Sequence, residues 1–139
     1  MRYTLQTVSN FIDKQTVALL GSLDQDGYPN IKAMLAPRKR EGLEKFYLTT
    51  NISSLRTNQL SENPRSCLYF CDKHTFRGAM FLGVVKILTD QESKTMIWQE
   101  GDRIYYKKGV TDPDYCVYEF TAHKGRYYAN LHSEDFPVK

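Results

Sequence analysis

The sequence predicts a mainly β protein, a small antiparallel β-barrel that is closed or split and carries short helices on its flank. Two observations support this fold class. Short apolar or alternating runs recur along the 139 residues, and turn-forming residues separate them. The helical patterns between these runs are short and too few for a doubly wound parallel sheet. The length is typical of one domain, and we expect a single domain over residues 1–139.

The first half of the chain predicts a helix, a hairpin and then a strand that leads into a second helix. Residues 4–14 carry apolar side chains at helical spacing, and Asp24-Gln25-Asp26-Gly27 predicts a turn. Asn63-Pro64 ends the second helix. The predicted strands of this half are residues 17–23, 30–36 and 46–50, and residues 37–44 are expected to form a polar loop.

The second half predicts more antiparallel strands. Gly83 lies inside one of them and indicates a bulge or a close backbone approach. Thr89-Asp90-Gln91-Glu92 predicts a capping box for a helix that ends near Trp98. The remaining expectations are strands at 65–71 and 77–88, an irregular segment at 101–113, a final hairpin of 115–122 and 126–131 turning at 123–125, and a frayed tail at 133–139.

Composition excludes several classes of protein. The formal net charge of +3 does not favour a nucleic-acid or membrane partner, and no stretch resembles a secretory signal or a membrane span. Cys67, Cys71 and Cys116 form no disulfide framework, so we expect reduced, mostly buried thiols and a cytoplasmic protein. Cys71 and His74 are spaced like half of a metal site, but there is no second half, and we expect no metal.

The segment 45–64 is a candidate anion site. A strand there runs into the N-terminus of a helix, where free N–H groups and the helix dipole favour negative charge. Thr50, Ser53 and Ser54 add hydroxyl donors, and Arg56 lies within about the first turn. The same residues would also suit an ordinary capped helix after a strand.

Two further features have alternative interpretations. Lys32 lies in the middle of a predicted strand, where a lysine either protects a sheet edge or points into an anion pocket. Aromatic residues make up 13% of the chain, which suits strands, a cofactor and a subunit contact. A small barrel with this much exposed aromatic surface predicts a symmetric homodimer.

Over residues 10–128 the pattern resembles the pyridoxamine 5'-phosphate oxidase-like, FMN-binding split barrels, and the general stress protein branch in particular. The resemblance lies in the order and spacing of several short motifs. These are Asp26-Gly27-Tyr28-Pro29, then Lys32, the run Phe46-Tyr47-Leu48-Thr49-Thr50, then Ser54, Arg56, Leu60, Asn63 and Pro64, followed by Gly83 and by Trp98, Tyr105-Tyr106, Gly109 and Asp112-Pro113-Asp114.

This resemblance implies an FMN-binding split barrel with FMN at a dimer interface. Lys32 and the backbone of Ala33-Met34-Leu35 would contact the cofactor, and Thr49 and Thr50 would line the site. Ser54 and Arg56 would hold the phosphate, in agreement with the anion site inferred above, which also includes Ser53.

The chain departs from the oxidase pattern at several positions. Lys32 replaces an arginine, Leu55-Arg56 replaces an Arg-Lys pair, Gly78 replaces a glutamine and Pro37 replaces a lysine. The substrate-binding residues near the C-terminus of the oxidase have no match. These differences argue against pyridoxamine phosphate as the substrate and leave flavin binding in place.

Two kinds of function follow. One is an FMN-dependent oxidoreductase with a small-molecule substrate or electron donor, NADH and NADPH among the candidates. The other is a non-catalytic or stress-response protein that binds flavin, or a relative that binds haem or a deazaflavin. Trp98, Tyr105 and Tyr106 are either core residues or flavin contacts, and for Trp98 we favour the core.

Overall fold

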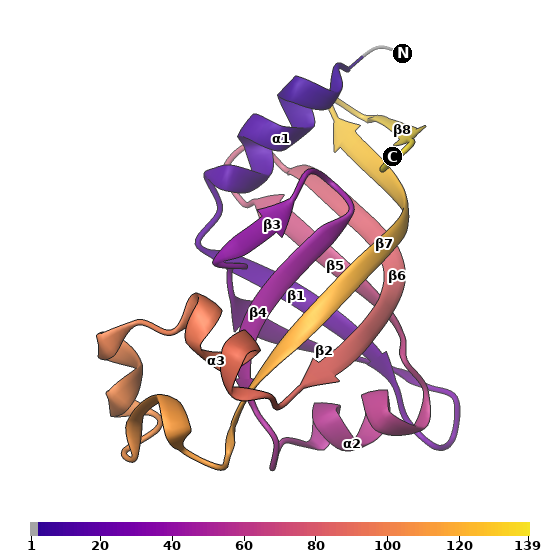
Figure 1. The fold of residues 1–139 in the computed structure, drawn as a ribbon. Helices are drawn as coiled ribbons and strands as arrows, with labels where there is room; N and C mark the ends of the chain where they lie inside the picture. The colour runs from indigo at the N-terminus through magenta and orange to yellow at the C-terminus, as the bar shows by residue number, and fades with distance from the viewer. Residues whose placement is uncertain (1–2) are drawn as a thin grey trace.

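The computed structural model describes residues 3–139, and a strongly curved sheet with peripheral helices dominates it (Figure 1). Residues 1 and 2, which the predicted domain includes, lie outside the described residues. The elements in chain order are α1 (Leu5–Asp13), β1 (Val17–Leu23), β2 (Pro29–Leu35), β3 (Lys39–Glu41), β4 (Lys45–Asn51), α2 (Leu55–Glu62), β5 (Arg65–Asp72), β6 (Arg77–Leu88), α3 (Gln91–Ile97), the 3₁₀ helices η1 (Glu100–Ile104) and η2 (Gly109–Thr111), β7 (Tyr115–Ala129) and β8 (His132–Phe136).

The strands form one antiparallel sheet in the order β2-β1-β5-β6-β7-β4-β3, and β8 pairs with β7. Within the described residues, the end strands β2 and β3 do not pair with each other, so hydrogen bonds do not close the barrel. Cα atoms of β2 nevertheless come within 8 Å of those of β4. The predicted fold, a mainly β, split antiparallel barrel with flanking helices, is confirmed.

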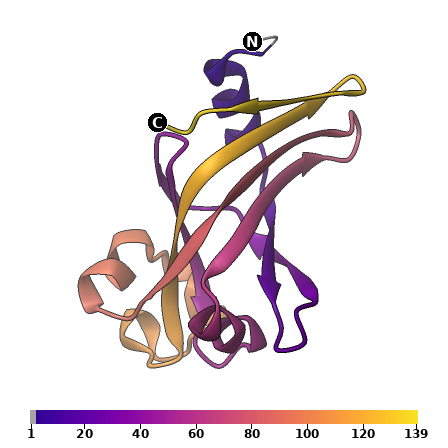
Figure 2. The ribbon, with the colours of Figure 1, turned by 90° about the vertical axis from the view of Figure 1, so that its right-hand side faces the viewer.

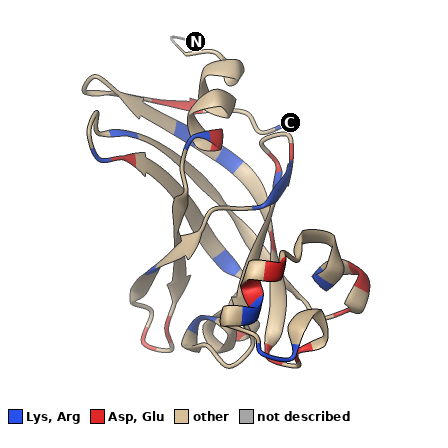
Figure 3. Cartoon of the chain, turned by 90° about the vertical axis from the view of Figure 1, so that its left-hand side faces the viewer, with Lys and Arg blue, Asp and Glu red and all other residues tan. Residues whose placement is uncertain are grey.

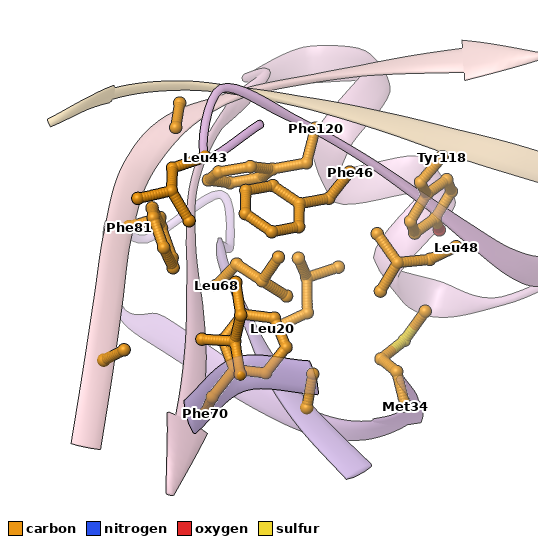
Figure 4. Close-up of a cluster of buried hydrophobic side chains, with 14 of the residues drawn as sticks. Leu20, Met34, Leu43, Phe46, Leu48, Leu68, Phe70, Phe81, Tyr118 and Phe120 are labelled. Atoms are coloured by element: carbon orange, nitrogen blue, oxygen red, sulfur yellow. The ribbon is translucent and has the colours of Figure 1, made fainter. Parts of the chain in front are cut away.

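Large side chains from the inner faces of the strands fill the barrel (Figure 4). The Phe46 ring packs against Phe70, Phe81 and Phe120, with ring centroids 4.9–6.3 Å apart. Leu20, Leu48 and Leu68 are fully buried beside them. This core explains why the continuous apolar runs of the sequence are strands. Helix α1 lies near one end of the barrel and α2 near the other (Figures 1 and 2).

The predicted final hairpin is wrong. Residues 115–129 form the single long strand β7, and the chain turns at Asn130 and Leu131, both with positive φ. Gly125 does not form a turn. Its lack of a side chain lets the Phe136 ring pack closely, because a Cβ there would lie 2.2 Å from that ring. The predicted frayed tail is also wrong, because residues 132–136 pair with β7 as β8.

Three smaller expectations are corrected as well. The expected loop at 37–44 contains the short strand β3, which pairs with β4. Asp90, and not Thr89, caps α3, because its carboxylate accepts the Ser93 N–H at 2.9 Å. The expectation that most of the thiols are buried holds only in part. Cys116 is buried, Cys67 is half-buried and Cys71 is exposed. At Gly83, by contrast, the register of β6 shifts as expected of a bulge.

Residues 90–114 form a lobe on the outer side of the barrel, beside β4 (Figure 1). We call this segment the side lobe. It covers a second apolar cluster, in which Ile97, Trp98 and Tyr106 pack with Tyr47 and Tyr115. Trp98 thus belongs to a core, as we favoured from the sequence. Two 3₁₀ helices, η1 and η2, occupy most of the segment expected to be irregular.

Cationic and anionic residues are interspersed on the face that Figure 3 shows. Among residues 3–139, no helix has the length and apolar character needed to cross a membrane.

Candidate functional site

A hollow of about 180 Å³ lies where the split of the barrel meets the side lobe. Two strands and one flanking helix contribute to it: the end of β2, the end of β4 and the start of α2. The side lobe supplies the remaining wall. The lining residues are Ala33, Met34, Leu35, Thr49, Thr50, Asn51, Arg56, Asp102, Tyr105 and Tyr106.

Arg56 gives this hollow its positive charge. It is the second residue of α2, and its side chain is half-buried. Its Nε is fully buried and has no hydrogen-bond partner. A buried donor without a partner is costly, so an acceptor is needed at this point. The residues around it therefore fit the phosphate of a bound nucleotide, for which a guanidinium is well suited.

The two serines before Arg56 are engaged within the protein. The Ser54 hydroxyl accepts the Thr57 N–H at 3.2 Å and caps α2. Ser53 donates its N–H and its hydroxyl to the Asp114 carboxylate, at 2.8 and 3.0 Å. Neither serine lines the hollow. An anion at the start of α2 would therefore compete with Asp114 for the donors of Ser53.

Strand β2 presents a free edge to the hollow. It pairs with β1 on one side only, so backbone groups of Ala33 and Leu35 face the split. Lys32 lies on this edge strand and is exposed, but it does not line the hollow. An anion contact by Lys32 therefore stays a prediction.

A buried ion pair fastens the side lobe next to the hollow. The Arg38 guanidinium donates to both Asp102 carboxylate oxygens, at 2.5 and 2.6 Å, and to the Ile97 carbonyl at 3.0 Å. Burial alone would raise the pKa of Asp102, but Arg38 and the Gln99 N–H hold that pKa below its ordinary value. The hydrogen bond from Arg38 to Asp102 likewise raises the pKa of the guanidinium.

The structure thus brings six of the nine predicted site residues to one hollow. These are Ala33, Met34, Leu35, Thr49, Thr50 and Arg56. Asn51 and Asp102 were missed. Asn51 directly follows the predicted threonines and could have been included on position alone. Asp102 gave no local signal, because its partner Arg38 lies 64 residues away in the sequence.

A larger hollow, of about 740 Å³, lies beside α3 and is lined by Lys39, residues 90–93, Thr95 and Met96. None of the predicted site residues reaches it. Two of its lining groups already interact, because the Lys39 ammonium contacts the Met96 sulfur at 3.5 Å. We therefore place the candidate site at the smaller hollow.

Comparison with known proteins gives the class of this protein. The family model described as pyridoxamine 5'-phosphate oxidase matches residues 4–129. The chain therefore belongs to the pyridoxamine 5'-phosphate oxidase family, which confirms the resemblance seen in the sequence. No curated protein sequence matches the chain.

A relative among solved structures is similar in sequence as well as in fold. It is a protein from Clostridium acetobutylicum described as related to general stress protein 26 of Bacillus subtilis, of the pyridoxinephosphate oxidase family. It shares 41% sequence identity, with 96% of this chain and 94% of that chain covered and a TM-score of 0.88.

Two more distant structures share the fold. General stress protein 26 from Bacillus anthracis is 16% identical, with 96% of this chain and 98% of that chain covered and a TM-score of 0.79. A pyridoxamine 5'-phosphate oxidase-related, FMN-binding protein from Nostoc punctiforme is 10% identical, with 96% of each chain covered and a TM-score of 0.75.

Proposed function

We propose that this protein binds FMN in the hollow and acts as an FMN-dependent oxidoreductase. The observation that carries the proposal is the buried, unpartnered Nε of Arg56, in a hollow formed by the split of the barrel. The family of the chain and the FMN-binding relative from Nostoc punctiforme support the choice of cofactor.

In this proposal, each part of the hollow has its own role. Arg56 binds the phosphate, and the Thr50 hydroxyl at the end of β4 adds a donor. The free edge of β2, at Ala33 and Leu35 on either side of Met34, offers backbone groups to the polar edge of the flavin ring. Lys32, exposed on the same strand, would add positive charge beside the site. The flavin supplies the redox chemistry, by hydride or electron transfer.

The protein also acts as a homodimer in this proposal. One chain encloses about 180 Å³, which is smaller than the roughly 300–1,000 Å³ of typical ligand pockets. The outer face of β1 and β2 exposes Val17, Ile31 and Leu35 to solvent. A second copy bound to this face would cover these side chains. It would also enclose the site, since Leu35 belongs both to this face and to the lining of the hollow.

A second candidate function is flavin binding without turnover. One observation favours it: the only carboxylate that lines the hollow in the described chain, that of Asp102, is already paired with Arg38. The lining therefore offers no free carboxylate to act as a general acid or base. Hydride transfer to or from a flavin does not need such a group, so the oxidoreductase proposal stands beside it.

Reconstitution with FMN followed by anaerobic reduction tests both candidates. We expect the purified protein to bind FMN and become yellow, and NADH or NADPH to bleach the bound flavin under anaerobic conditions. Bound FMN that neither nicotinamide reduces, with no acceptor turned over, would favour the second function. A protein that takes up no FMN would contradict both.

A further inference from the structure

Tyr105 is a large aromatic side chain that faces solvent at the candidate site. It follows the last residue of η1, is 68% exposed and lines the hollow. Its neighbour Ile104 is 76% exposed. Burying such side chains is favourable, so adjacent exposed apolar residues at the rim of a site indicate that something packs on them.

Asp102, which is hydrogen-bonded to Arg38, holds the backbone of Tyr105 in place. The Asp102 carbonyl accepts the N–H groups of Tyr105 and Tyr106, both at 2.9 Å. The Asp102 side chain is held by both arms of the Arg38 guanidinium, and the side chains of the pair are 5% and 15% exposed. The ion pair therefore fixes the end of η1 relative to β2, because Arg38 lies three residues after β2 ends.

Tyr106 forms a rigid support behind Tyr105. Its ring packs against Tyr115 at 5.1 Å and Trp98 at 6.4 Å, and burial raises the pKa of its phenol. The Tyr105 ring lies 6.4 Å from that of Tyr106, on the exposed side of this cluster. Tyr105 thus combines a fixed backbone with a largely exposed ring.

The two walls of the hollow differ in a way that suits a flat aromatic ligand. Strand β2 contributes the small or aliphatic side chains of Ala33 and Leu35, while Tyr105, directly after η1, contributes an aromatic ring. We propose that Tyr105 packs against the isoalloxazine ring of the bound flavin, and that Arg38 and Asp102 are positioning residues for it. This inference rests on the proposed FMN site, but no relative described above assigns a role to Tyr105.

The test is a comparison of FMN and riboflavin binding by Tyr105 variants. An aromatic contact changes affinity by about two- to tenfold. Tyr105→Ala should therefore weaken the binding of FMN and of riboflavin equally, by that factor, and raise the fluorescence of the bound flavin. Tyr105→Phe should leave the affinities and the fluorescence unchanged. Tyr28→Ala is the matched control, because Tyr28 is 69% exposed but lies in the β1–β2 turn, away from the hollow.

A double-mutant cycle tests the role of Arg38. Arg38→Met should reduce flavin affinity about as much as Tyr105→Ala, and it should add little in the Tyr105→Ala background. Arg40→Met is the control, because Arg40 also donates to both carboxylate oxygens of an aspartate, Asp13 of α1, at 2.9 and 2.8 Å. Trp98 emission and the thermal transition report whether each variant is folded.

The outcomes separate this inference from the proposed function. If the wild-type protein binds FMN and Tyr105→Ala binds both flavins as tightly, the inference is wrong and the FMN proposal stands. The inference is also wrong if Tyr105→Ala dissociates a dimer without changing flavin fluorescence, since Tyr105 would then contact the partner. If the wild-type protein binds neither flavin, both proposals fail.

Discussion

Gly83 shows how one missing side chain shapes the sheet. The register between β6 and β7 shifts at this residue, and a Cβ there would lie 2.0 Å from the Thr121 carbonyl oxygen. Because backbone cannot move aside as a flexible side chain can, we expect Gly83→Ala to destabilise the protein by about 1–3 kcal/mol, the usual cost of overpacking. Urea unfolding measures this change.

Gly101→Ala is the matched control for that experiment. Gly101 is exposed, and a Cβ there would meet nothing within 4 Å. Its substitution should change the free energy of unfolding by no more than about 0.5 kcal/mol. Equal effects at the two glycines would show that the close approach at Gly83 does not limit stability.

Asp102 should make the stability of the side lobe depend on pH. Its folded pKa lies below its unfolded value, so the ion pair with Arg38 contributes stability above the unfolded pKa of about 3.9. That contribution is lost as the pH falls through the folded pKa. We expect wild-type protein to be more stable than Asp102→Asn at neutral pH, and the difference to shrink below about pH 4. Thermal melts of both proteins across this range measure it, and a constant difference would contradict the assignment.

At the scale of elements, Ser54 at the start of α2 is expected to cap the helix and not to bind the phosphate of FMN. Ser54 caps the helix, so Ser54→Ala should cost about 1 kcal/mol of stability. Because its hydroxyl lies outside the hollow, FMN and riboflavin affinities should change together. A loss confined to FMN would show that Ser54 also binds the phosphate, as the family resemblance implies.

Helices and strands that are marked by apolar runs and turn residues nearby in the chain could be predicted from the sequence. The hairpin β1–β2 follows from two apolar runs around Asp24-Gln25-Asp26-Gly27, and the backbone of this turn is closed by Asp24. Strands β3 and β8 could not be predicted in this way. Both are short, polar edge strands that owe their conformation to pairing with β4 and β7.

The part of the candidate site that the barrel and α2 supply could be predicted, and the part that the side lobe supplies could not. Residues 33–35, 49–50 and Arg56 lie in two continuous stretches whose strand and helix boundaries the sequence indicates. The contribution of the side lobe depends on Arg38 meeting Asp102, which no pattern of nearby residues reveals. Similarly, the pairing of Ser53 with Asp114 joins residues 61 positions apart.

For the whole molecule, the exposed apolar face of β1 and β2 is where we expect the interface of the proposed dimer. Ile31 is 67% exposed and lies opposite Gly21 in the β1–β2 register. A charge there should not disturb the core, but it would be buried in the dimer. We expect Ile31→Glu to convert a dimer to a folded monomer, as measured by sedimentation equilibrium at micromolar concentration.

Leu131→Glu provides the control for this substitution. Leu131 is 93% exposed at the β7–β8 turn, away from the proposed interface. It should leave the dimer intact. A wild-type monomer that binds FMN, or a dimer that Ile31→Glu does not affect, would contradict the proposed assembly.

The affinity of Arg56→Ala for FMN and for riboflavin tests most directly whether Arg56 binds the phosphate of FMN in the hollow. A charge-assisted hydrogen bond contributes roughly 1.5–3 kcal/mol, which corresponds to a ten- to hundredfold change in affinity. We predict that Arg56→Ala weakens FMN by about that factor and leaves riboflavin, which lacks the phosphate, nearly unchanged. Equal losses for both flavins, or no loss for either, would contradict the placement of the phosphate at Arg56.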